Sequence, residues 1–250
     1  MKPEIILFLL ILLIAGCQAP AEYDLLIRNG RIYDGSGSPP YSGDLAIQGD
    51  TIVQTGRLLH AKGKAEIDAQ GMAVAPGFIN ILSWANESLI EDGKSQSDIR
   101  QGVTLEVFGE GESWGPLNEK MKSDMKKSQG DIRYDIEWTT LGEFLDYLVK
   151  KGVTPNVASV VGAATLRTYV IGPENRPATV AEIDSMQSLV RQAMEEGAMG
   201  IGSALEYVPG AFAGKDELTA LCKVAARFGG MYISHLRNEG EHRSEERRVG

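Results

Sequence analysis

Short apolar stretches alternate with turn residues between residues 23 and 75. Residues 25–27 and 32–33 flank the pair Asn29-Gly30, and residues 45–47 and 52–53 flank Gly49-Asp50. Such dipeptides between short β-prone stretches are typical of tight hairpins. The pattern therefore predicts a small β-sandwich module over residues 23–75, with a hairpin at each pair.

From residue 76 onward, strand-like apolar runs alternate with helical patterns. The predicted strands cover residues 77–81, 103–108, 157–161, 199–201 and 231–234. Thr140 with Glu143, and Thr179 with Glu182, have the spacing of a capping box that opens a helix. This alternation favours a parallel sheet with helical crossovers. We expect an α/β fold in which residues 76–242 form about the first five strands of a (β/α)8 TIM-type barrel, which needs about 250 residues when complete.

The chain opens with an unbroken apolar run over residues 5–14, preceded by Lys2. A bilayer span needs about 20 residues, so this length suits the apolar part of a signal peptide. The run ends in Ala15-Gly16-Cys17, which resembles a bacterial lipobox. We expect residues 1–17 to be a lipoprotein signal, Cys17 to be lipidated and residues 18–22 to be a tether. The alternative is an ordinary cleaved signal.

These expectations give an exported protein that a lipid anchor holds on a cell-envelope membrane. Gln18, rather than an aspartate, follows the cysteine, which favours the outer membrane if the source is Gram-negative. The formal net charge is −9, and there is no basic stripe before residue 243, so nucleic acid is not an expected partner. Cys222 lies in an apolar helical pattern and is expected to be a buried small hydrophobe.

An ordered set of motifs follows the first apolar runs. The motifs cover residues 23–35, 75–79, 101–104, 162–167, 197–210 and 232–240. Together they resemble the amidohydrolase superfamily and, within it, the N-acyl-D-amino-acid deacylase branch. The resemblance implies an enzyme that hydrolyses a non-peptide carbon–nitrogen bond in a small N-acyl amino acid or related amide. It also implies zinc or another divalent metal, which lowers the pKa of water and polarises a carbonyl.

Several positions where that family places metal ligands hold residues that cannot bind a metal. The usual His-x-His of the first strand corresponds to Leu82 and Trp84, the cysteine position to Gly111, and a histidine position to Ala163. His235 alone matches a ligand position. The whole protein is therefore expected to use a different ligand set or to be a metal-free relative.

Four further residues are candidates for the site. Glu110 and Glu112 are candidate metal ligands beside His235, because carboxylates bind zinc and harder cations; the alternative is a solvated acidic loop. The resemblance implies that Tyr207 binds the substrate carboxylate. Arg237 is a candidate substrate contact, or the partner of Glu239 in a salt bridge.

The last eight residues, 243–250, have no apolar periodicity. We expect them to be a non-native tail, with a charged helix start as the alternative. The resemblance places the catalytic general base beyond residue 250, so the chain as given is expected to be inactive. A second function stays open: a lipid-anchored, non-catalytic binding protein on a degenerate amidohydrolase scaffold.

Overall fold

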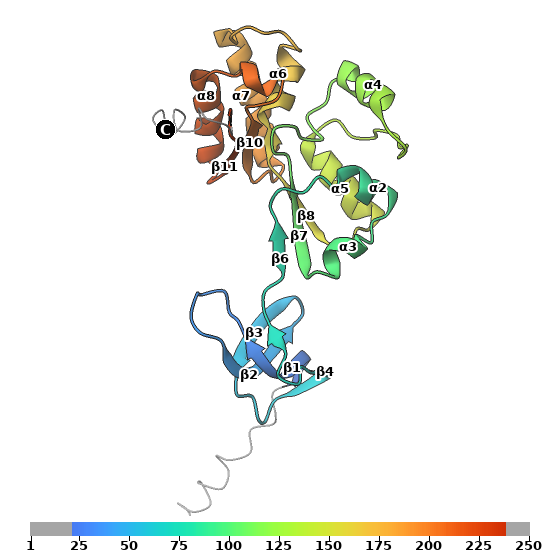
Figure 1. Cartoon of the computed structure of the whole chain (residues 1–250), viewed down its shortest axis with the longest axis vertical. Coiled ribbons are helices and arrows are strands. Elements are labelled where there is room, and N and C mark those ends of the chain that lie inside the picture. Colours follow the sequence, from blue (N-terminus) through green and yellow to red (C-terminus); the bar gives the residue numbers. More distant parts are fainter. Residues whose placement is uncertain (1–21, 239–250) are drawn as a thin grey trace, which may run out of the picture. The chain divides into compact units, whose positions relative to one another are not determined.

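A computed structural model describes residues 22–238 of the chain (Figure 1). The chain divides into two compact units, Met1–Pro76 and Gly77–Gly250. Cys17, Glu239 and residues 243–250, on which several sequence predictions rest, lie outside the described residues.

The first unit contains one five-stranded sheet. Its strands are β1 (Glu22–Ile32), β2 (Tyr41–Gln48), β3 (Thr51–Gly56), β4 (Lys62–Asp68) and β5 (Ala73–Val74). The order is β3-β2-β1-β4, and β5 also pairs with β1. All described strands of this unit share that sheet, so the prediction of a two-sheet sandwich is wrong. Leu26 and Ala46 of this sheet form a small core with Leu58.

One of the two predicted hairpins is present. β2 and β3 pair antiparallel around Gly49, whose φ is +62°, as the Gly49-Asp50 pair predicts. The hairpin at Asn29-Gly30 is wrong, because β1 runs through both residues. Asn29 has a φ of +54°, and the register with β2 shifts between Ile27 and Gly30, which is a β-bulge rather than a reversal.

The second unit is a mixed α/β structure whose strands are all parallel. They are β6 (Phe78–Asn80), β7 (Val103–Phe108), β8 (Asn156–Ser159), β9 (Val161–Gly162), β10 (Gly200–Ala204) and β11 (Met231–His235). One sheet has the order β6-β7-β8 and the other the order β11-β10-β9. Only Val160 separates β8 from β9, and its amide bonds Phe108 O at 2.9 Å. Four of the five strands predicted after residue 76 are confirmed, and the one predicted at residues 157–161 is divided at Val160 between β8 and β9.

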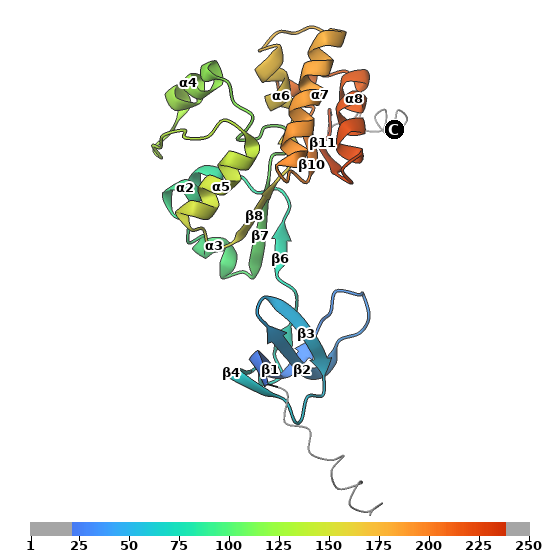
Figure 2. The ribbon, with the colours of Figure 1, turned by 180° about the vertical axis from the view of Figure 1, so that it is seen from behind.

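Helices connect these strands. They are α2 (Asn86–Glu91), α3 (Gln96–Ile99), α4 (Glu119–Ser128), α5 (Leu141–Lys151), α6 (Ala163–Val170), α7 (Val180–Glu195) and α8 (Lys215–Ala226), with a short 3-10 helix η1 (Gly210–Phe212). Both predicted capping boxes are confirmed, at Thr140 before α5 and Thr179 before α7. α7 and α8 lie side by side (Figure 2) and pack with α6 and β10.

The core of the second unit lies between the helices and the strands. Its largest buried apolar side chains include Trp138, Phe144, Leu148, Met186 and Ile201. Cys222 is only half-buried at the edge of this core; burial raises the pKa of its thiol. Within the described residues, no helix is long and apolar enough to cross a bilayer.

Candidate functional site

A cavity of about 430 Å³ opens at the carboxyl ends of the parallel strands. The lining residues end or follow β6, β7, β9, β10 and β11. The lining residues are Leu82, Trp84, Glu110, Gly111, Glu112, Ala164, Ala204, Tyr207, Val208 and His235. Seven of the residues singled out from the sequence therefore meet at one place: Leu82, Trp84, Glu110, Gly111, Glu112, Tyr207 and His235. Ligand sites of parallel α/β folds occur at this end of the strands.

The segment after β6 carries Leu82 and Trp84 into the cavity lining while Ser83, between them, is buried. The Ser83 amide bonds Val107 O at 2.9 Å, and its hydroxyl donates to Glu106 Oε2 at 2.7 Å. Glu106 is fully buried in β7 and also accepts from Ser95 Oγ at 2.7 Å. The sequence analysis missed this anchor, although a glutamate inside the apolar run of residues 103–108 is a signal that could have found it.

The glycines after β7 let the acidic loop pack tightly against the neighbouring strands. Gly109 has a φ of +101°, and a Cβ there would lie 2.0 Å from Val160 O. At Gly111, with a φ of +80°, a Cβ would lie 2.6 Å from the Cβ of Ala204. Any side chain at either position, a cysteine at Gly111 included, would displace the next strands. This close packing brings Glu110 and Glu112 to the cavity wall.

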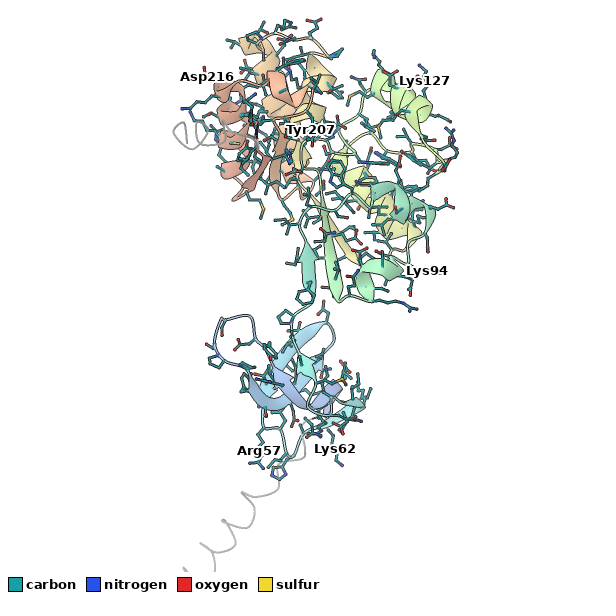
Figure 3. All side chains as sticks on the ribbon, viewed as in Figure 1. Arg57, Lys62, Lys94, Lys127, Tyr207 and Asp216 are labelled. Atoms are coloured by element: carbon teal, nitrogen blue, oxygen red, sulfur yellow. The ribbon has the colours of Figure 1, made fainter. Side chains whose placement is uncertain are left out.

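His235 ends β11 beside the segment that follows β10. Its Nε2 lies 3.4 Å from Glu206 Oε2, and its ring centroid is 5.3 Å from that of Tyr207 at an interplanar angle of 41°. Tyr207, labelled in Figure 3, is 59% exposed, so most of its ring is open to a ligand. Glu206 was not singled out from the sequence, although it directly precedes Tyr207 in a family motif.

Arg237 does not line this cavity. Its Nη1 donates to Ala211 O at 2.8 Å and its Nη2 to Ala213 O at 3.0 Å. The guanidinium thus fastens the η1 segment that follows Tyr207. Its proposed partner Glu239 is outside the described residues, and direct contact with a substrate stays a prediction.

The described residues do not fit a zinc centre of the usual kind. Structural and catalytic zinc sites use at least three nitrogen, sulfur or carboxylate ligands around one point. Leu82, Trp84 and Gly111 line the cavity where the family resemblance places ligands. Over residues 22–238, no three His, Cys, Asp or Glu side chains are grouped closely enough to hold a metal ion. His235, Glu110 and Glu112 share the cavity without forming such a group.

The fold and the strand-end cavity define a mixed α/β protein whose structural neighbours are amidohydrolases. Over most of its length the chain is homologous to the N-acyl-D-amino-acid deacylases of that family. It is 36% identical over 227 residues to a D-aminoacylase of Alcaligenes xylosoxydans xylosoxydans, a match covering 88% of this chain and 46% of the relative. An N-acyl-D-aspartate deacylase of the same organism is 34% identical over 226 residues, covering 90% of this chain and 45% of the relative.

A solved structure shows the same relationship. The N-acyl-D-glutamate deacylase of Bordetella bronchiseptica, complexed with zinc and a phosphonate inhibitor, superposes with a TM-score of 0.78 at 30% identity, covering 90% of this chain and 47% of that one. The chain therefore spans about half the length of the relatives it matches. No protein-family model matches it.

Proposed function

We propose that the protein acts as a hydrolase of carbon–nitrogen bonds in N-acyl-D-amino acids or closely related amides. The observation that carries this proposal is the homology over most of the chain to relatives that are D-aminoacylase and N-acyl-D-amino-acid deacylases. The cavity agrees with it in position, because it lies where strand-end residues of five successive strand regions converge.

The parallel strands suggest a barrel scaffold for this activity. β6 to β11 follow one another in sequence order around the two sheets, with β8 and β9 separated by one residue. Helices α5, α7 and α8 each precede the next strand, as in repeated βα units. We propose that this arc is the first part of a (β/α)8 barrel, with the five-stranded sheet of residues 22–74 as its preceding module.

Within the cavity, Tyr207 and His235 are the side chains best placed to contact a substrate. The exposed Tyr207 phenol can donate a hydrogen bond to a substrate carboxylate. Glu206 lies close enough to His235 Nε2 to hold the imidazole in one orientation. The solved deacylase structure contains zinc, and a zinc ion bound in this cavity would polarise the scissile carbonyl and activate water, but residues 22–238 supply no ligand set for it.

A binding protein on an inactive scaffold is the second candidate. Leu82, Trp84 and Gly111 favour it, because apolar side chains and a glycine occupy the cavity at positions where the resemblance implies ligands. The comparisons favour the hydrolase, since the matched relatives are deacylases.

Release of free amino acid from N-acyl-D-amino acids by the full-length protein tests the hydrolase. The D enantiomers should be cleaved and the L enantiomers serve as the control. Tyr207→Phe should raise KM by about tenfold, because it removes one hydrogen bond to a charged group. Ligand binding without release of amino acid from either enantiomer would establish the binding protein instead.

We further propose that the protein is exported and anchored to a cell-envelope membrane through lipid on Cys17. The support is the sequence of residues 5–17, an apolar run that ends in small residues before the cysteine. Cys17→Ser should move the protein from the membrane fraction to the soluble fraction and abolish incorporation of labelled fatty acid. Cys222→Ser is the matched control and should change neither. Membrane association that survives Cys17→Ser would contradict the anchor.

A further inference from the structure

A second cavity, of about 390 Å³, adjoins the first. Trp84 and Glu112 line both cavities, so the two share a wall. The rest of the second cavity is formed by the segment after Glu112, by α4, by α6 and by the turn at Gly172-Pro173. Each volume falls within the range of about 300–1,000 Å³ that is usual for small-molecule sites.

The polar side chains around the second cavity are largely engaged by protein partners. Ser113 Oγ donates to Gly115 O at 2.5 Å, and Thr165 Oγ1 donates to Ser113 O at 3.2 Å. Asn118 caps α4, accepting from the Met121 amide at 2.9 Å and donating to Tyr169 O at 3.2 Å.

Three charged side chains line the second cavity: Glu112 lies on the wall shared with the first cavity, and the other two pair with each other. Lys120 Nζ and Asp124 Oδ2 form an ion pair at 2.6 Å on the exposed face of α4. A ligand group that adds neither charge nor hydrogen-bonding atoms therefore suits this cavity, because it would leave those bonds intact.

Five large apolar side chains also line the second cavity. They are Trp84, Trp114, Leu117, Met121 and Met125. One wall is rigid, because Trp114 is stacked on Trp138 at 5.8 Å and lies 5.2 Å from Phe144. Helix α4 contributes the two methionines, whose unbranched side chains adapt to irregular apolar shapes. A lining that combines stacked aromatic rings with adaptable methionines suits a flexible hydrocarbon chain.

We propose that the second cavity receives the aliphatic acyl chain of an N-acyl amino acid whose amino-acid part occupies the first cavity. This inference rests on the proposed function, because that function supplies the amide that joins the two parts. The shared residues Trp84 and Glu112 mark where the amide would pass from one cavity to the other. The protein thereby selects substrates with acyl groups longer than acetyl.

Equilibrium binding of N-acetyl-, N-butanoyl- and N-octanoyl-D-alanine to the purified chain tests the inference. Tryptophan fluorescence reports the binding, since Trp84 and Trp114 both line the second cavity. Affinity should rise about two- to fourfold for each added methylene until the cavity is filled. Equal affinity for all three compounds, or no binding of any, overturns the inference.

Substitutions in α4 locate the effect. Met125→Asp should weaken octanoyl binding at least about tenfold and leave acetyl binding unchanged, because a carboxylate in an apolar cavity opposes a hydrocarbon chain. Ser123→Asp, at an exposed position of the same helix that does not line the cavity, should change neither. If Met125→Asp unfolds α4, Met121→Trp takes its place in the test. It fills the cavity without adding a charge and should exclude the octanoyl chain.

The outcomes separate the acyl cavity from the proposed hydrolase. Chain-length-dependent binding that the α4 substitutions remove, with no release of D-alanine by the full-length protein, would support the cavity and contradict the hydrolase. Release of D-alanine with equal affinity for all chain lengths would support the hydrolase and contradict the cavity.

Discussion

Ser83 Oγ donates a 2.7 Å hydrogen bond to Oε2 of Glu106, a carboxylate that is fully buried. Ser83 lies between Leu82 and Trp84, which both line the candidate site. The bond thus ties the segment after β6 to β7. The other oxygen of Glu106 is held by Ser95, so both ends of the carboxylate are occupied.

Ser83→Ala should lower the free energy of unfolding by about 1–3 kcal/mol, because it leaves a buried acceptor without its partner. Urea denaturation followed by circular dichroism measures this. Ser97→Ala is the matched control, since Ser97 is exposed and its hydroxyl bonds the neighbouring Asp98, and should stay within about 0.5 kcal/mol of the unsubstituted protein. Equal effects of the two substitutions would show that Glu106 does not depend on Ser83.

A buried ion pair also links α6 to α8. Arg167 Nη1 lies 2.7 Å from Glu217 Oε2, and the two side chains are 0% and 4% exposed. Arg167 Nη2 also donates to the carbonyl oxygens of Glu174 and Arg176. Burial raises the pKa of Glu217, and the Arg167 charge opposes that rise.

Removing one member of this pair should be costly, because the other stays buried with an unpaired charge. Arg167→Met alone should destabilise the protein by about 3–5 kcal/mol, and the double variant Arg167→Met/Glu217→Leu by less than that. A double-mutant cycle from denaturation data measures the coupling. Asp24→Asn, which breaks an exposed pair with Lys64, should have a much smaller effect. Additive effects of the two buried substitutions would show that the pair is not coupled.

The sequence predicted much of the second unit because strand periodicity and helix caps are local signals. Thr140 and Thr179 cap helices through residues three positions away, so the spacing alone is informative. The hairpin prediction at Asn29-Gly30 failed because a bulge and a turn use the same left-handed backbone conformation. Only the pairing of β1 with both β2 and β5 decides between them.

The candidate site was predictable as a location but not as a complete set of contacts. Glu110, Glu112, Tyr207 and His235 follow strands that run in the same direction, so their meeting could be expected. The pairing of His235 with Glu206 and the second cavity beside α4 depend on how loops pack. No spacing in the sequence encodes that packing.

Low pH should destabilise the N-terminal end of α7. Arg176, together with the backbone amide and hydroxyl of Thr179, holds the pKa of Glu182 far below its usual value. A carboxyl with a lowered folded-state pKa stabilises the protein above its unfolded pKa of about 4.3, and this stabilisation is lost as the pH falls toward the folded value. Glu182→Gln should therefore lower the melting temperature at pH 7, and the difference should shrink steadily below about pH 4.

Thermal unfolding at several pH values measures this difference. Glu195→Gln, an exposed position on the same helix, is the matched control and should show a smaller difference at pH 7. The difference in melting temperature between Glu182→Gln and the unsubstituted protein should not stay constant from pH 7 to pH 3. A constant difference would contradict the assignment of the effect to the Glu182 charge.

Two substitutions should give the first cavity a metal site that the described residues do not form. Leu82 and Trp84 line the same cavity as Glu112 and His235, at the positions where the resemblance implies two histidines. The double variant Leu82→His/Trp84→His places two imidazoles beside a carboxylate and a third imidazole, a donor set that suits tetrahedral zinc.

Zinc affinity, measured by competition with a chromophoric chelator, should rise at least about tenfold over either single variant, because each single variant supplies one ligand fewer. Circular dichroism of the metal-free proteins controls for misfolding. If the double variant binds zinc no better than Leu82→His alone, residues 82 and 84 do not point to a common centre, and the ligand positions inferred from the resemblance are wrong for this chain.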